Sequence, residues 1–371
     1  MKNCRSTPSD AQVRSLGAPS HARVDFVRRT PQDMQRFNNR PAIASSQQAR
    51  NMPTHDDPSS QLDHAEVVSG RWLVKAILIV LGVSGVALYL TVCLLFYQGQ
   101  WQFTFFPPKT IQPGVATVAA NSGLPITDVH FDTTEEGVER LNGWWIPSPS
   151  PVAPLSLFVV LFCPNGHTDL PDNVEALKAF HALGVSVFAF DYQGFGNSQA
   201  GHPSQKKAYA NGAAALTYLT GLRHIPADHV VLYGARLGAA VAAHVAQSSP
   251  NIAGLILEDP QPSLATEVKR EQHIHLLPMW LVFQDRFDIS GIVPSLKMPK
   301  LILSTAAMHP YASGTAQVFH DATAPKQQAA IAESSNQPLY ALSEWRSVVG
   351  NFLHSLANQL SQQAVSPRTL K

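Results

Sequence analysis

The sequence predicts an α/β fold: a mostly parallel sheet with helices on both faces, preceded by one transmembrane helix and a disordered N-terminal tail. Two observations support this prediction. Between residues 126 and 365, short and nearly uninterrupted apolar runs alternate with longer helix-like segments, as expected for parallel strands buried on both faces. Earlier in the chain, residues 76–97 contain no charged side chain, which is typical of a membrane-spanning helix.

Residues 1–70 form the predicted disordered tail. Ser, Gln, Asn, Pro and Arg are frequent there, and the apolar residues follow no sustained period. Such a segment buries too little apolar surface to offset the conformational entropy lost on folding. We therefore expect no packed core in this part of the chain.

The predicted transmembrane helix covers residues 71–98, and its uncharged centre is residues 76–97. A helix of that central length spans about 33 Å, enough to cross a hydrocarbon core of about 30 Å. The alternative is a buried helix of a soluble core, although such helices rarely lack every charge over this length. Arg71 and Lys75 precede the span, whereas the first basic residue after it is Lys109. This bias predicts a cytoplasmic N-terminus and a C-terminal domain on the other side of the membrane.

Residues 99–125 are predicted as a linker and residues 126–365 as the α/β domain. A hairpin is expected first, and the strands and helices that follow it should alternate along the chain. Strands are expected at 129–133, 141–146, 155–163, 185–191, 229–233, 254–258 and 300–304, and helices at 173–183, 205–222, 237–247 and 343–360. Residues 260–298 lack this alternation of strand-like and helix-like segments and are predicted to form a short cap over the carboxyl edge of the sheet.

The overall composition excludes several classes of function. The chain has 27 basic and 26 acidic residues, a net charge of +1, so it lacks the basic surplus that nucleic-acid binding requires. Its cysteines, Cys4, Cys93 and Cys163, fall in three different segments, which argues against a disulfide scaffold and excludes a four-cysteine zinc site. We predict no cofactor, no metal and no nucleic-acid partner.

The turn after the predicted strand at 229–233 is the most informative local feature. Ligands of open α/β sheets bind outside the carboxyl ends of the strands. Here Gly234 and Gly238 bracket Arg236, and an Ala-rich helix follows. This strand–Gly-x-x-x-Gly–helix pattern predicts the sharp turn of a nucleophile elbow, whose usual sequence is G-x-S-x-G.

The stretch from about residue 100 to residue 360 resembles the α/β-hydrolase superfamily, and most closely its branch with a single N-terminal membrane span. The similarity is carried by FTFFPP, RLNGWWIPS, DYQGFGNSQAGHPS, the elbow and PKLIL, which begin at Phe103, Arg140, Asp191, Gly234 and Pro299. The resemblance implies the α/β-hydrolase fold. It also implies a Ser on the elbow, a His that takes the proton of the Ser, and an acid that orients the His.

The positions at which the resemblance expects the triad hold other residues. Arg236 replaces the Ser, and a guanidinium stays protonated and cannot act as nucleophile or base. Met308 lies near the expected acid and Ser335 near the expected His. Cys163 and Pro164 stand where the family has the His-Gly that shapes the oxyanion hole, although Asn165 and Leu237 retain backbone N–H groups that could donate. We therefore predict no catalytic residue in this chain.

Arg236 leaves two hypotheses open. It could form an internal ion pair with Glu258 or Asp259, because buried charges are normally paired. It could instead bind the carboxylate or phosphate of an anionic small molecule. The sequence therefore predicts a membrane-anchored binding or scaffolding module that contacts the membrane through residues 76–97 and has an anionic ligand or a protein partner. The alternatives are a sensor that binds an anion at Arg236, and an esterase or thioesterase with non-standard catalytic residues.

Overall fold

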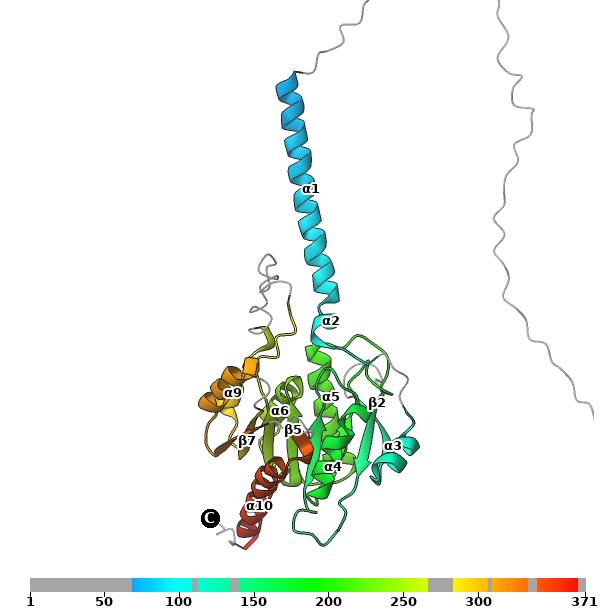
Figure 1. Cartoon of the computed structure of the whole chain (residues 1–371), viewed down its shortest axis with the longest axis vertical. Coiled ribbons are helices and arrows are strands. Elements are labelled where there is room, and N and C mark those ends of the chain that lie inside the picture. The colour runs from blue at the N-terminus through cyan, green and yellow to red at the C-terminus, as the bar shows by residue number, and fades with distance from the viewer. Residues whose placement is uncertain are drawn as a thin grey trace, which may run out of the picture. The chain divides into compact units, whose positions relative to one another are not determined.

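A computed structural model describes residues 69–108, 113–133, 140–265, 283–305, 309–332 and 339–365, so the tail predicted at 1–70 lies almost entirely outside the described residues. The described strands form one eight-stranded sheet in the order β1-β2-β4-β3-β5-β6-β7-β8 (Figure 1). Their bounds are β1 Thr127–Asp132, β2 Arg140–Ile146, β3 Val159–Cys163, β4 Ser186–Phe190, β5 Val230–Ala235, β6 Gly254–Glu258, β7 Lys300–Thr305 and β8 Lys326–Ile331.

The sheet is mostly parallel, as the sequence predicts. The hairpin β1–β2 and the pair β2–β4 are antiparallel, and every pairing from β4 through β3 to β8 is parallel. In β3, β4 and β6 every residue is buried, because helices cover both faces of these central strands. The carboxyl ends of β3, β5, β6 and β7 therefore share one edge of the sheet, which we call the elbow edge.

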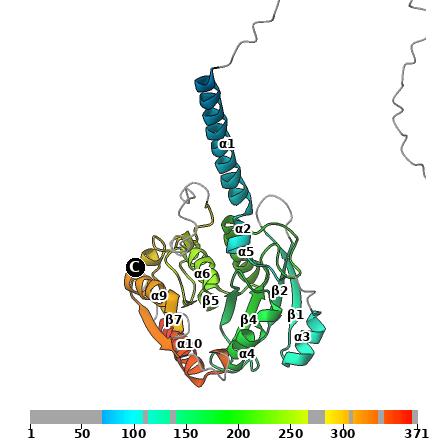
Figure 2. The same cartoon turned by 45° about the horizontal axis from the view of Figure 1, so that its top comes forward.

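Two apolar clusters separate the helices into layers. One cluster joins the sheet to α5 (Gln205–Thr217), α6 (Leu237–Ser248) and α9 (His309–Asp321). The other joins it to α3 (Val115–Ser122), α4 (Val174–Ala182) and α10 (Ser343–Val365). In Figure 2, α5 and α6 lie on one side of the strands and α4 and α10 on the other. Helices on both faces confirm the predicted three-layer α/β arrangement.

The apolar segment before the domain forms one helix, α1 (Gly70–Gly99), of 30 residues with none buried. It is long and apolar enough to cross a membrane. Its bounds exceed the predicted 71–98 by one residue at each end. A short helix, α2 (Trp101–Thr104), follows it directly.

Four elements lie where the sequence analysis expected none. The predicted linker 99–125 contains α2 and α3, and the stretch after β7 contains α9 and β8. β8 reads KQQAAI and leaves Gln327 and Gln328 exposed, because it is an edge strand that pairs with β7 alone. A strand of that kind lacks the apolar run by which the inner strands are recognised. Of the predicted cap, residues 266–282 lie outside the described residues.

Candidate functional site

The turn from β5 into α6 has a strained backbone. Arg236 occupies it with φ 52° and ψ −112°, a conformation that few non-glycine residues adopt. The two glycines have no room for a side chain. A Cβ on Gly234 would overlap the carbonyl oxygen of Gly238, and a Cβ on Gly238 would overlap that of Cys163. Both glycines are therefore required by close backbone approach.

Backbone pairing places Arg236 in the middle of the elbow edge. Gly234 pairs with Cys163 of β3 on one side and with Leu257 of β6 on the other. The Arg236 N–H donates to the Glu258 carbonyl oxygen over 2.8 Å, and the Ala239 N–H donates to the Arg236 carbonyl over 3.0 Å. The turn is thus held between the loop that follows β3 and the end of β6.

The loop after β3 carries His167, which sequence reasoning missed. Partial desolvation lowers the pKa of this imidazole, and the positive charge of nearby Arg236 lowers it further. The Phe106 ring contacts the His167 ring edge-on, with 4.6 Å between centroids. His167 is therefore a neutral side chain beside the Arg236 charge at neutral pH. Its position two residues after Asn165, in the turn that follows a predicted strand, was the available signal.

The two residues predicted as oxyanion donors lie at this edge. Asn165 is in the loop after β3, and Leu237 is the first residue of α6. The N–H groups of a first helical turn have no carbonyl partner within their own helix, so the Leu237 amide can serve a ligand. The Leu237 side chain packs close over Gly166, where a Cβ would lie 2.8 Å from it. The site thus combines the Arg236 guanidinium with the backbone N–H and the apolar side chain of Leu237.

Glu258 ends β6 and points into the layer of α4 and α10. Its Oε2 accepts hydrogen bonds from the Tyr233 hydroxyl at 2.9 Å and the Trp345 indole N–H at 3.4 Å, and its Oε1 accepts one from the Tyr340 hydroxyl at 3.1 Å. Burial raises the pKa of Glu258 to about 7 despite these donors. Such a carboxyl changes charge near neutral pH.

Asp259 occupies the next position, with a positive φ of 43°. Its carboxylate accepts from the Thr305 backbone N–H at 2.9 Å and from the Thr305 hydroxyl at 2.6 Å, which ties the end of β6 to the end of β7. The contacts described here for Glu258 and Asp259 are with neutral donors. The ion pair between Arg236 and either residue stays a prediction.

A catalytic relay requires a nucleophile hydrogen-bonded to a base. Between side chains within the described ranges, no hydrogen bond joins a hydroxyl or thiol to an imidazole. Met308 and Ser335, at the positions expected for the acid and the His, lie outside the described residues. Where the structure describes the chain, no group of three or more His, Cys, Asp and Glu residues is placed to hold a metal ion.

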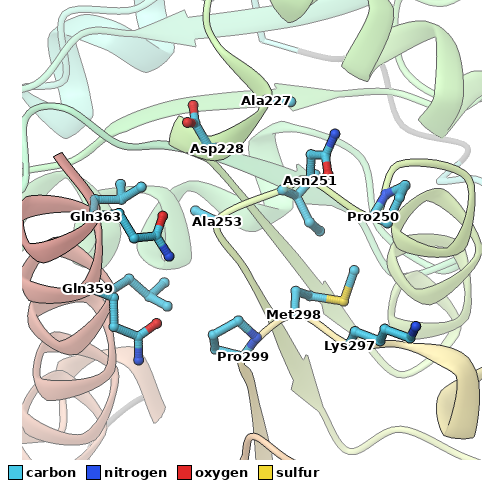
Figure 3. A pocket seen from close by; sticks show the side chains of 13 residues that line it. Ala227, Asp228, Pro250, Asn251, Ala253, Lys297, Met298, Pro299, Gln359 and Gln363 are labelled. Atoms are coloured by element: carbon cyan, nitrogen blue, oxygen red, sulfur yellow. The ribbon is translucent and has the colours of Figure 1, made fainter. Parts of the chain in front are cut away.

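A hollow lies at the opposite edge of the sheet, where β5, β6 and β7 begin (Figure 3). Its volume is about 660 Å³, and the residues that line it include Asp228, Asn251, Lys297, Gln359 and Gln363. None of the predicted site residues lines this cavity. It also lacks any strained backbone or buried polar group of the kind found at the elbow.

The family model "Serine aminopeptidase, S33" matches residues 159–364, more than half of the chain. An uncharacterised protein of Mycobacterium tuberculosis is 30% identical over 234 residues, which cover 63% of this chain and 76% of that protein. An α/β-hydrolase domain-containing protein of Caenorhabditis elegans is 35% identical over 152 residues, 40% of this chain and 43% of that protein. An esterase of Pyrococcus furiosus superposes with a TM-score of 0.52 at 17% identity, covering 68% of this chain and 98% of the esterase, which shows a shared fold.

Proposed function

The chain belongs to the serine aminopeptidase S33 family of α/β hydrolases, and on that premise we propose that it is a membrane-anchored pseudoenzyme that binds a ligand or partner without cleaving it. One observation supports this most strongly. The backbone at Arg236 has the strained geometry of a nucleophile elbow, with glycines on both sides, while its side chain is a guanidinium. The turn of a nucleophile elbow is thus formed around a side chain that cannot attack, which supports the proposal.

The chemistry supports the same proposal. Arginine is protonated at any working pH and holds no lone pair for attack or for proton abstraction. Triad residues act as a unit, and loss of the serine alone costs on the order of 10⁶ in rate in a well-studied protease. Arginine is suited to binding an anion, because its planar guanidinium can donate two parallel hydrogen bonds to one carboxylate or phosphate.

The proposed anchor is α1. Its 30 residues, none of them buried, extend for about 45 Å, and the span within it, residues 76–97, has no charged side chain. We assign the N-terminus to the cytoplasm and the α/β domain to the far side, because Arg71 and Lys75 precede the span and the first basic residue after it is Lys109.

A hydrolysis assay on the full chain tests the loss of catalysis. Ester and thioester substrates of several chain lengths should show no turnover above that of a heat-unfolded sample, both for the wild type and for Arg236→Ala. Turnover by the wild type that persists in Arg236→Ala would instead favour the esterase alternative with non-standard residues. The variant Arg236→Ser tests whether a serine at the elbow is enough to give measurable hydrolysis.

A sensor of anionic small molecules is the second candidate, and the proximity of Arg236 to neutral His167 favours it. Titration with acetate, phosphate and sulfate should raise the melting temperature of the wild type and leave that of Arg236→Ala unchanged. Equal shifts in both proteins would remove the sensor.

A further inference from the structure

The connection between α1 and the domain runs along the elbow edge. We call residues 100–106 the strap. At its start, the Gln284 backbone N–H donates to Gln100 Oε1 over 2.7 Å, and Gln284 Nε2 donates to the Tyr97 hydroxyl over 3.3 Å. The Trp101 ring packs on the ring of His202, in the loop after β4, with 4.5 Å between centroids. The end of α1 therefore contacts one segment of the domain, at Gln284, and the start of α2 contacts another, at His202.

The middle of the strap inserts into the domain. Phe105 is 1% exposed and contacts Phe195 and Phe287 edge-on, at centroid distances of 6.2 and 5.8 Å. The Phe106 N–H donates to the Gly166 carbonyl oxygen over 2.9 Å. The strap thus contacts the loop after β3, the loop after β4 and residues 284–287, which belong to the described part of the predicted cap. The first of these, the loop after β3, lies beside the turn that holds Arg236, because a Cβ on Gly166 would lie 2.8 Å from the Leu237 side chain.

This attachment determines which side of the domain faces the membrane. The strap has seven residues and could extend for at most about 25 Å, and four of them are helical in α2, so its actual reach is shorter. If α1 crosses a bilayer, the elbow edge must therefore lie at the headgroup layer. The opposite edge, with its polar hollow, must then face away from the membrane.

Two apolar side chains, Phe106 and Leu237, lie between the end of α1 and Arg236. Phe106 is 51% exposed and contacts the His167 ring edge-on, and half-buried Leu237 follows Arg236 directly. A small soluble anion would use the guanidinium but not these apolar side chains. A molecule with an anionic head and an acyl chain would use both, because burying the chain against Phe106 and Leu237 is favourable while the head pairs with the charge.

We infer that the ligand of the elbow is an anionic amphiphile taken from the adjacent membrane leaflet, whose carboxylate or phosphate pairs with Arg236 and whose chain lies along Phe106 and Leu237. The inference rests on the proposed function, since it requires α1 to be in the membrane and the elbow to bind without cleaving. It adds the class of ligand and its source.

Photolabelling tests this inference with the full chain in phosphatidylcholine vesicles. The probe is a long-chain fatty acid that carries a diazirine in its chain, and the matched probe is the fatty alcohol of the same chain. Labelling by the acid should fall on peptides that contain residues 100–108 or 164–170. It should exceed labelling by the alcohol about tenfold, as expected for one lost charge-assisted hydrogen-bonded pair.

Variants assign the effect to the elbow. Arg236→Gln should lower labelling by the acid about tenfold, whereas Arg223→Gln should leave it unchanged, because Arg223 stacks on Trp145 elsewhere in the domain at 4.2 Å. Equal labelling of wild type and Arg236→Gln, equal labelling by acid and alcohol, or labels on α1 alone would overturn the inference. If Arg236→Gln does not fold, the comparison of acid with alcohol on the wild type decides.

Competition identifies the source of the ligand. Unlabelled long-chain fatty acid in the vesicles should displace the probe, whereas millimolar acetate or phosphate in the buffer should not. Full displacement by soluble phosphate would contradict a membrane source. Failure of the proposed function is recognised separately: release of fatty acid from an ester by the wild type would show catalysis, whatever the labelling pattern.

Discussion

The two edges of the sheet differ in what they offer a ligand. The edge where β5, β6 and β7 begin has a hollow of about 660 Å³ with a polar, open lining. The elbow edge has a non-glycine residue at positive φ, two glycines pressed against backbone carbonyls, and a cation beside a neutral imidazole. The first edge is thus marked by an open hollow, whereas backbone strain and a positioned charge mark the second.

Under the proposed function, backbone strain indicates the site in this fold and the polar hollow does not. A strained turn costs on the order of 1–3 kcal/mol and persists only when its surroundings hold it in place. At the elbow the turn has persisted although the residue at its centre is an arginine.

Gly238→Ala is expected to produce the largest effect. The added methyl would overlap the backbone carbonyl of Cys163, which is fixed in β3, so we expect a loss of about 4 kcal/mol in the free energy of unfolding or no folded protein at all. Gly291→Ala is the control, because open space surrounds that glycine, and it should change stability by less than about 0.5 kcal/mol. Chemical denaturation followed by circular dichroism measures both. A Gly238→Ala protein as stable as the control would show that the elbow is not tightly packed.

Phe105→Ala should cost about 3–4 kcal/mol, because it removes a fully buried ring from the domain end of the strap. Phe106→Ala is the neighbouring control. Its ring is 51% exposed, so its loss should cost less than about 1 kcal/mol while the backbone hydrogen bond to Gly166 remains. Thermal unfolding of the full chain in one detergent compares the two. Equal costs would mean that the strap does not insert at Phe105.

Glu258→Gln should flatten the dependence of stability on pH. The folded-state pKa of Glu258 is raised to about 7 from an ordinary value of 4.5, so the native state holds this proton more tightly. The resulting stabilisation is fully present below pH 4.5 and is lost as the pH rises through 7, by at most about 1.4 kcal/mol per pH unit. The variant cannot titrate, so its free energy of unfolding should fall less than that of the wild type between pH 5 and pH 7 (roughly the window of the shift).

Glu344→Gln serves as the control for that experiment, because Glu344 is exposed at the start of α10. Its pH profile should match that of the wild type. The raised pKa of Glu258 would be contradicted if the profile of Glu258→Gln matched it as well.

Lys297→Ala and Gln359→Ala, at the opposite edge, should have the smallest effects. Both side chains line the polar hollow and neither belongs to the apolar clusters, so each change should alter stability by less than about 0.5 kcal/mol. Binding of the acidic photoprobe should also be unaffected. A marked loss of binding in either variant would reverse the comparison between the two edges.

Sequence reasoning identified the inner strands and the elbow because their signals are local. Continuous apolar runs predicted β3, β4 and β6, and the spacing of Gly234 and Gly238 predicted the turn around Arg236. β8 was missed because an exposed edge strand carries no such run.

The surroundings of Arg236 could not be predicted from local patterns. Phe106 and His167 are far apart in the chain but are in contact beside Arg236. The hydrogen-bond donors to Glu258 likewise come from separate parts of the chain, namely Tyr233, Tyr340 and Trp345. Phe105 and Phe106 lie within the FTFFPP stretch that supported the family resemblance, but their contacts with the loops depend on tertiary packing.

The central claim is that the elbow has lost its nucleophile, and covalent labelling tests it most directly. A fluorophosphonate probe reacts with an activated serine, so the full-length wild type should show no label by intact-mass spectrometry under conditions that label an active serine esterase to completion. Stoichiometric labelling of the wild type, mapped to a residue of this chain, would contradict the account.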